Sequence, residues 1–274
     1  MLRRPFARFF SASLLFSASL LQGCALFGGP KPRTLSEIVD SGTIRVGMSG
    51  EQPPLNMATR SGELIGLEVA LINVLAENMG VKADLEQRPF NQLLEALEAG
   101  EVDLVMSGMA ITPQRNVRVA FVGPYFISGK SILTRSKALA AAKDAAALNQ
   151  VSLRIAALTG STSEDFVGRV LPQVELVTTD TLDQAIHMVI AGQVDAMLAD
   201  SETCHFAKLR YKEAGLFTLE APITVEPMGI ALSQDAPALA NILENYLSAL
   251  EGTGVIERVR KYWFENDAWL EALR

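Results

Sequence analysis

The 274 residues of the chain are 49% hydrophobic and 20% charged, which is enough apolar material for one large globular unit or two modest lobes. Its 20 glycines and 12 prolines exclude collagen and a mostly disordered chain, and its two cysteines exclude a disulfide scaffold. The formal net charge of −7 argues against nucleic acid as a partner and against binding to an anionic membrane surface by bulk charge.

Residues 1–23 are predicted to be a secretory signal peptide. They begin with basic residues and continue into an apolar run from Phe9 to Leu21, which is too short and too rich in serine to span a bilayer. The segment carries three arginines and no acid, so its removal lowers the formal net charge from −7 to −10. The mature protein is therefore expected in the periplasm or another extracytoplasmic compartment.

Cys24 stands directly behind the apolar run, in the sequence Leu21-Gln22-Gly23-Cys24, which resembles the lipobox of bacterial lipoproteins. The resemblance implies that Cys24 becomes the lipidated N-terminus and holds the protein at a bacterial membrane; a chance cysteine behind an ordinary signal is the alternative. Residues 24–36 contain two glycines and two prolines and are expected to form a tether. Cys204 then lacks an intrachain partner and is expected to be buried and unreactive.

Two ten-residue segments of the chain echo each other. Residues 99–108 read AGEVDLVMSG and residues 191–200 read AGQVDAMLAD, and each follows a helix-like segment, 91–98 or 183–190. In each copy the helix ends near a glycine C-cap, and a short apolar strand of the buried parallel kind follows. Strand–helix–strand units recur in any α/β protein, but the shared Gly-x-Val-Asp sequence favours two related units.

A second echo lies upstream of the first in each half of the chain. Residues 44–47 and 153–156 are strand-like, and each is followed by a loop rich in Gly, Ser or Thr and then by a helical pattern. The remaining predicted elements are, in chain order, a helix at 137–148, a strand at 228–232 and helices at 237–250 and 255–264.

These elements predict an α/β fold of two lobes, each a mostly parallel sheet flanked by helices. Residues 37–132 and 220–274 are assigned to lobe 1 and residues 133–219 to lobe 2, so the chain crosses between the lobes twice and forms a hinge. Ligands of open α/β sheets bind beyond the carboxyl ends of the strands. The candidate ligand-binding loops therefore follow Val46, Val105, Leu158 and Leu198.

The loop after Val105 leads into a predicted helix that starts at Thr112, a natural N-cap, and Pro113, which suits the first helical position. Arg115 then falls in the first turn, where the helix dipole disfavours a cation. A bound carboxylate would explain an arginine there, because the planar guanidinium can hold both carboxylate oxygens. A solvated arginine, or one paired with a nearby acid, is the alternative.

The predicted second lobe offers hydrogen-bond donors at the start of another helix. Thr159-Gly160-Ser161-Thr162 precedes a predicted helix at 163–170, and free backbone N–H groups at such a start bind anions. Plain helix capping by these residues is the alternative. Asp200 ends the second echo strand and is a candidate for binding an ammonium group, with a turn or capping role as its alternative.

Several short sequences recur in the order typical of one protein family: GTIRVG at 42–47, PP at 53–54, GELIG at 62–66, the Gly-x-Val-Asp strand, ITPQR at 111–115 and FVGPY at 121–125. With them, residues 36–265 resemble the family-three bacterial solute-binding proteins, the polar amino-acid receptors of ABC importers. The resemblance implies a type II periplasmic-binding-protein fold that closes on a small zwitterionic solute, in the simplest case an amino acid. It also implies a monomer without a cofactor that delivers its ligand to an ABC permease in the inner membrane.

The resemblance also implies the roles of individual residues. Arg115 would bind the ligand carboxylate beside Ser107 and Gly108, Ser161 and Thr162 would be the second-lobe donors, Asp200 would bind the ammonium group, and Phe90 would pack against the ligand side chain. Residues 66–70 read GLEVA where the family usually has GFDVD, and this stretch is expected to be largely scaffold. Two positions expected in the cleft also depart from the family pattern. Ala110 replaces a usual hydroxyl donor, and Gln52 replaces a covering aromatic and is expected to line the side-chain pocket. These departures leave a solute other than a standard amino acid as an alternative.

The scaffold also resembles that of periplasmic cyclohexadienyl dehydratases, which is the enzyme alternative. Such an enzyme needs a general acid in the cleft, and Glu202 is the candidate. Metal binding is not expected, because His187 and His205 have no second ligand at metal spacing. We therefore expect a protein that binds its solute without catalysis.

Overall fold

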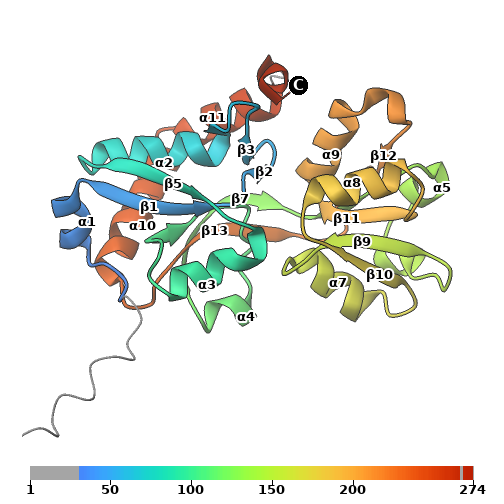
Figure 1. Ribbon diagram of the computed structural model, residues 1–274, viewed down its shortest axis with the longest axis horizontal. Helices are drawn as coiled ribbons and strands as arrows, with labels where there is room; N and C mark the ends of the chain where they lie inside the picture. The colour runs from blue at the N-terminus through green and yellow to red at the C-terminus, as the bar shows by residue number, and fades with distance from the viewer. Residues whose placement is uncertain (1–30, 266–267, 274) are drawn as a thin grey trace, which may run out of the picture.

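The computed structural model describes residues 31–265 and 268–273, which form two α/β lobes side by side (Figure 1). The predicted signal peptide, Cys24 and the first part of the predicted tether lie outside the described residues. The first helix, α1 (Leu35–Ser41), begins where Thr34 and Glu37 form a reciprocal capping box. Within the described ranges, no helix is long and apolar enough to cross a membrane.

Lobe 1 is built on a five-stranded mixed sheet. Its strands, in spatial order, are β5 (Lys82–Gln87), β1 (Thr43–Met48), β6 (Leu104–Val105), β13 (Glu226–Leu232) and β7 (Ala120–Ser128). The first three strands are parallel, and β13 runs antiparallel to both β6 and β7. The other elements of the lobe are the helices α2 (Leu67–Asn78), α3 (Leu93–Glu98), α4 (Pro113–Asn116), α10 (Pro237–Gly252) and α11 (Val255–Glu265), and a small sheet of β2 (Glu51–Gln52), β3 (Asn56–Ala58) and β4 (Leu64–Ile65).

Lobe 2 has a sheet of the same plan. Its strands, in spatial order, are β10 (Glu175–Thr179), β9 (Arg154–Leu158), β11 (Ala196–Asp200), β8 (Lys130–Thr134) and β12 (Phe217–Thr218). Three parallel strands are again followed by two antiparallel pairings. The helices of the lobe are α5 (Lys137–Ala140), α6 (Ala145–Leu148), α7 (Thr162–Val170), α8 (Leu182–Ile190) and α9 (Ser201–Arg210).

The echo between residues 99–108 and 191–200 has a structural cause. Asp103 precedes β6, where its N–H donates to the Arg45 carbonyl (2.9 Å) and its Oδ2 accepts from the Arg45 N–H (2.7 Å). Asp195 makes the same two bonds with Arg154, at 2.9 and 2.8 Å. The shared aspartate therefore fixes β6 beside β1 in one lobe and β11 beside β9 in the other.

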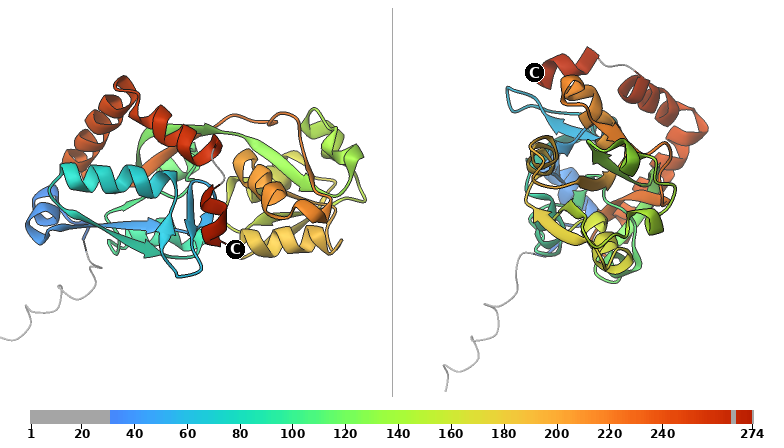
Figure 2. Two further views of the ribbon diagram at one scale, coloured as in Figure 1. Left: turned by 90° about the horizontal axis from the view of Figure 1, so that it is seen from above. Right: turned by 90° about the vertical axis from the view of Figure 1, so that its right-hand side faces the viewer.

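The chain passes between the lobes twice, and the two crossing segments lie side by side (Figure 2). β7 leads into β8 through Gly129, and residues 219–225 lead back from β12 to β13. The Lys130 N–H donates to Thr224 Oγ1, and the Lys130 carbonyl accepts from the Ile223 N–H, both at 2.8 Å. A Cβ on Gly129 would lie 2.1 Å from the Thr224 carbonyl oxygen, so the close approach of the crossings requires glycine.

The helix predicted at 137–148 is wrong in one respect, because the structure has two short helices there, α5 and α6. The side chains of Ser136 and Asp144 each accept a hydrogen bond from a backbone N–H three residues on, so each starts a helix of its own. The other predicted helices and strands agree with the structure within two residues at their ends.

The core of each lobe lies between its sheet and its helices. In lobe 1, Leu75 of α2 and Leu243 of α10 belong to one buried cluster with Leu104 of β6. Cys204 of α9 is buried in the core of lobe 2, as predicted. Burial raises the pKa of its thiol, so the group stays protonated and unreactive.

Candidate functional site

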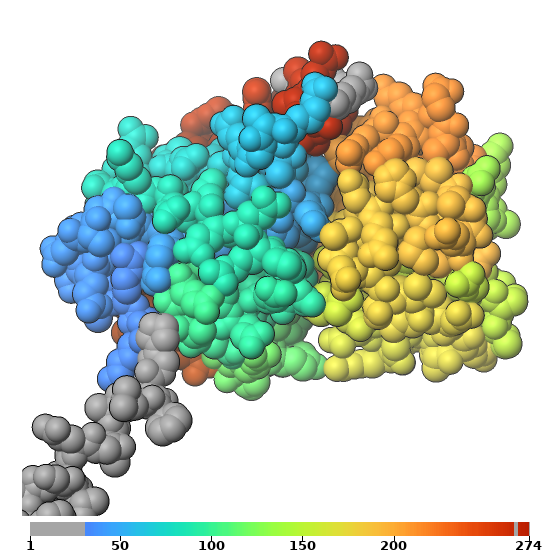
Figure 3. All heavy atoms as spheres, in the orientation of Figure 1, coloured from blue at the N-terminus to red at the C-terminus, as the bar shows by residue number. Residues whose placement is uncertain are grey.

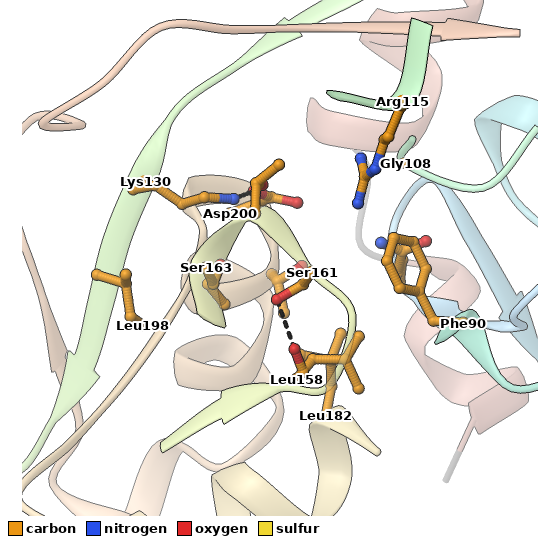
Figure 4. A pocket seen from close by; sticks show the side chains of 14 residues that line it. Phe90, Gly108, Arg115, Lys130, Leu158, Ser161, Ser163, Leu182, Leu198 and Asp200 are labelled. Carbon is orange, nitrogen blue, oxygen red and sulfur yellow. Dashed lines mark hydrogen bonds and ion pairs between the residues drawn. The ribbon is translucent and has the colours of Figure 1, made fainter. Parts of the chain in front are cut away.

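Seven of the eight predicted ligand-binding residues line one cleft between the lobes. Lobe 1 supplies Gln52, Phe90, Gly108 and Arg115, and lobe 2 supplies Ser161, Thr162 and Asp200. Figure 4 shows Arg115 and Phe90 on one side of the cleft and Asp200 and Ser161 on the other. Ser107 is fully buried and does not line the cleft.

Arg115 is held at the start of α4 by the predicted cap, since the Thr112 side chain accepts a hydrogen bond from the Arg115 N–H (3.2 Å). Its guanidinium donates to the Ala110 carbonyl (3.0 Å) and lies 5.7 Å above the centre of the Phe90 ring. Burial lowers the pKa of Arg115, while Asp200 and other carboxylates oppose the change. An arginine stays charged under such a shift, so the cleft holds a permanent cation.

The two lobes are closed on each other around the cleft, and Figure 3 shows them in contact on one face. Arg115 Nη2 donates across the gap to the Gly160 carbonyl (3.1 Å). Glu51 of β2 lies beside the start of α8, and burial there raises the pKa of its carboxyl. A Cβ on Gly160 would lie 3.0 Å from the Cβ of Asn91 in the opposite lobe. Closure therefore brings lobe 1 directly against the start of α7.

The hydroxyls of Ser161 and Thr162 have partners within the protein. Ser161 caps α7, because its Oγ accepts from the Glu164 N–H (3.2 Å) and donates to the Leu158 carbonyl (2.6 Å). Thr162 Oγ1 donates to Glu226 Oε2 (2.8 Å). Amides in the first turn of a helix have no acceptor within the helix. The donors that α7 offers to an anion are therefore the N–H groups of Thr162 and Ser163 rather than these hydroxyls.

Asp200 ends β11 with its carboxylate beside a lysine that sequence reasoning missed. Lys130 Nζ lies 2.6 Å from Asp200 Oδ1 and 3.0 Å from Glu226 Oε2, and the lysine side chain is 1% exposed. Burial alone would lower the pKa of Lys130, but the two carboxylates outweigh this effect and raise it. Glu226 was missed as well. The sequence signal for both residues is their position in the chain: Lys130 directly follows the first crossing between the lobes, and Glu226 begins β13, the strand after the second crossing.

Gln52 is fixed by a buried polar network rather than by packing alone. Its Oε1 accepts a hydrogen bond from Ser107 Oγ (3.0 Å), and Ser107 Oγ accepts in turn from the Ser49 N–H (2.9 Å). Ser107 therefore does not line the cleft itself but orients Gln52, which does.

Gly108 is held by the buried carboxylate of Glu68, a third residue that the sequence did not assign to the site. Glu68 Oε1 accepts from the Gly108 N–H (2.7 Å) and from the Tyr125 hydroxyl, and Glu68 Oε2 accepts from Asn56 Nδ2 (2.6 Å). Burial raises the pKa of Glu68. Gly108 has a φ of +52°, and a Cβ there would lie 2.6 Å from Gln52 Nε2, so this position requires glycine.

Glu202, the candidate general acid, lines a different cavity. That cavity lies between α9 and the C-terminal segment, where Phe206 stacks on Trp269 with ring centres 5.4 Å apart. Burial raises the pKa of Glu202 to about 7, and Ser128 Oγ donates to its Oε2 (2.6 Å). The neighbouring Thr203 lines the ligand cleft instead. The described residues contain no group of three or more side chains able to hold a metal ion.

Two lobes that close on a cleft, with a cation from one lobe and a carboxylate from the other, define a solute-binding protein of the periplasmic type. The family model described as bacterial extracellular solute-binding proteins, family 3, matches residues 44–266. The chain belongs to this family, which confirms the resemblance seen in its sequence.

Related proteins support the same class. The ABC transporter arginine-binding protein 1 of Escherichia coli K12 is 24% identical over 227 residues, which cover 81% of this chain and 90% of the relative. The cyclohexadienyl dehydratase of Pseudomonas aeruginosa is 22% identical and covers 84% of this chain and 86% of its own. A putative binding component of an ABC transporter from Wolinella succinogenes, complexed with lysine, has a TM-score of 0.80 at 29% sequence identity. The match covers 84% of this chain and 99% of the solved chain. The fold is therefore that of type II periplasmic binding proteins, and the chain falls among the amino-acid-binding components of ABC transporters.

Proposed function

We propose that the protein captures one zwitterionic amino acid between its lobes and delivers it to an ABC permease in the inner membrane. The observation that carries the proposal is that Arg115 and Asp200, from opposite lobes, line the same closed cleft. A zwitterion matches this pair, because its carboxylate faces a cation and its ammonium group faces a carboxylate.

The chain's own groups give each part of the ligand a partner. Two of the five N–H groups of Arg115 donate to Ala110 and Gly160 in the described structure, which leaves donors for a carboxylate. The first-turn amides of α7 add donors from the other lobe. Asp200 Oδ2 faces the ammonium group, and Phe90 and Gln52 border the ligand side chain.

Hinge closure couples binding to the shape of the molecule. Each lobe supplies half of the polar contacts, so the ligand binds the closed form more tightly than the open form. The differential affinity shifts the population toward the closed form, which is the form a permease would receive.

The variant Arg115→Ala tests the assignment. We expect it to remove the rise in melting temperature that an amino acid gives the wild type, because a hydrogen bond to a charged group contributes about 1.5–3 kcal/mol. The measurement is a thermal-shift screen of amino acids, polyamines and small organic acids. Arg118→Ala is the matched control, since Arg118 is exposed and pairs with Glu98 outside the cleft. An Arg115→Ala protein that binds as tightly as the wild type would refute the site.

The dehydratase alternative is favoured by one observation, the relative of that name. Against it, Glu202 lines the cavity beside α9 and not the ligand cleft. The test is to incubate the purified protein with prephenate or arogenate and to measure turnover. Binding without turnover is the expected result.

Lipidation of Cys24 is part of the proposal for where the protein acts. We expect the mature chain to begin at a lipidated Cys24 and to sediment with membranes. Cys24→Ala should release the exported protein into the soluble fraction. Mass spectrometry of the mature N-terminus checks the modification directly.

A further inference from the structure

Lys130 places an ammonium group of the protein itself on the aspartate that faces the ligand. Its Nζ contacts Asp200 Oδ1 at 2.6 Å and Glu226 Oε2 at 3.0 Å, and Thr162 Oγ1 donates to the same Glu226 oxygen. The backbone of Lys130 is bonded on both sides to the second crossing segment, at Thr224 and Ile223. The lysine is therefore fixed at the point where both crossings meet the cleft.

The charges at this end of the cleft balance. Arg115 and Lys130 are the cations, and Asp200 and Glu226 are the carboxylates, so the formal charge of these four groups is zero. Glu202, which interacts with Asp200, adds no charge below its pKa of about 7. An amino acid with an uncharged side chain keeps that balance when it binds. A cationic side chain adds a positive charge for which these groups hold no counter-charge, and a closed cleft screens such a charge poorly.

We propose that Lys130 determines the specificity of the cleft, selecting amino acids with uncharged side chains over those with cationic side chains. The inference rests on the proposed function and names the ligand class of the same site. Without Lys130, the four positions would carry one excess negative charge, which a cationic side chain would neutralise. Relatives that are named for arginine or were solved with lysine therefore do not fix the ligand of this chain.

The test is isothermal titration calorimetry with three probes of similar length: L-glutamine, L-arginine and L-glutamate. It is performed at about pH 6, below the pKa of about 7 of Glu202, so that this carboxyl keeps its proton and adds no charge beside Asp200. We expect the wild type to bind glutamine about tenfold or more tightly than either charged probe. Asp165, Glu51 and Asp183 also lie around the cleft, but they are the same in the wild type and in every variant. The change in a ratio of Kd values from wild type to variant therefore reports only the substitution made.

Charge variants of Lys130 and Glu226 then shift the ligand preference in opposite directions. Lys130→Gln should shift the arginine-to-glutamine ratio of Kd about tenfold or more toward arginine. Glu226→Gln should shift the glutamate-to-glutamine ratio toward glutamate. The double variant restores the charge balance and should restore the preference for glutamine, which a purely steric effect of either change would not do.

Lys208→Gln is the control, since Lys208 is exposed on α9 and its loss changes the charge of the protein outside the cleft. It should leave all three ratios within about twofold of the wild type. A melting curve without ligand checks that each variant folds, and the single variant that folds carries the test if the other does not.

Two results would overturn the inference. One is a wild type that binds arginine more tightly than glutamine, and the other is a set of folded variants whose ratios stay those of the wild type. In both cases the proposed amino-acid-binding function stands. A wild type that binds no amino acid at all instead refutes the proposed function, and the inference falls with it.

Discussion

Glu202 and Lys130 show two outcomes for a charged side chain buried in this protein. Lys130 stays charged because two carboxylates offset the cost of its burial. Glu202 Oε1 is buried and has no hydrogen-bond partner among the described residues. Burial, with the nearby Asp200, raises the pKa of Glu202 to about 7. The unpaired carboxyl therefore holds a proton at a pH where an exposed one is ionised.

The raised pKa of Glu202 predicts that the free energy of unfolding falls as the pH rises from 4.5 to about 7. In this range the folded protein keeps the proton on Glu202, with its pKa of about 7, while the unfolded chain releases it near 4.5. The contribution is complete below pH 4.5, is lost by about pH 7, and amounts to about 3 kcal/mol. Glu202→Gln does not titrate and should flatten this part of the profile of unfolding free energy against pH, measured with urea.

The matched control for this profile is Glu213→Gln, because Glu213 is exposed. It should follow the wild-type curve. A Glu202→Gln profile as steep as that of the wild type would show that another group controls this range.

At the residue scale, the sequence predicted the positions that strand ends and helix starts determine. Arg115 follows a cap that the structure confirms, and Asp200 ends the strand that was predicted to end there. Lys130 and Glu226 were not predicted, because their contact depends on how the two crossings pack together. Ser107 was placed correctly along the chain, but its burial behind Gln52 depends on a hydrogen-bond network that sequence does not reveal.

At the scale of elements, short segments at strand ends position the site. α4 has four residues and presents Arg115, and α7 presents its first turn from the other lobe. The repeated aspartates Asp103 and Asp195 were visible in the sequence as an echo, and the structure explains them by the bonds that pair neighbouring strands. The antiparallel half of each sheet was not predicted, because those strands follow from the two crossings rather than from a local pattern.

Gly160 tests the contact between α7 and lobe 1. It has a φ of +75°, and a Cβ there would lie 3.0 Å from the Cβ of Asn91 across the cleft. Gly160→Ala should therefore oppose closure and weaken amino-acid binding about tenfold, equivalent to roughly 1.4 kcal/mol. Titration calorimetry with the amino acid that gives the largest thermal shift measures the effect.

Gly192→Ala separates closure from backbone strain. Gly192 has a similar φ of +70°, and a Cβ there meets nothing within 4 Å. The control therefore carries the backbone strain of a left-handed position without the contact between lobes, and its affinity should stay within about twofold of the wild type. Equal losses in both variants would mean that strain, and not closure, weakens binding.

At the scale of the whole molecule, two sheets of one plan are joined by two adjacent crossings. The repeat in the sequence predicted two lobes, and the family match and the similar solved structures confirm the fold. The contacts that hold the lobes closed were not predicted. The hydrogen bond from Arg115 to the Gly160 carbonyl joins residues 45 positions apart, which meet only when the lobes close. Binding and closure are therefore one equilibrium, in which a ligand held by both lobes favours the closed form.

A crystal structure of the protein bound to the amino acid that raises its melting temperature most would test this account most directly. We predict density in the cleft with the ligand carboxylate on the Arg115 guanidinium and the ligand ammonium group on Asp200, while Lys130 remains between Asp200 and Glu226. A ligand bound outside the cleft, or inside it without contact to either Arg115 or Asp200, would contradict the account.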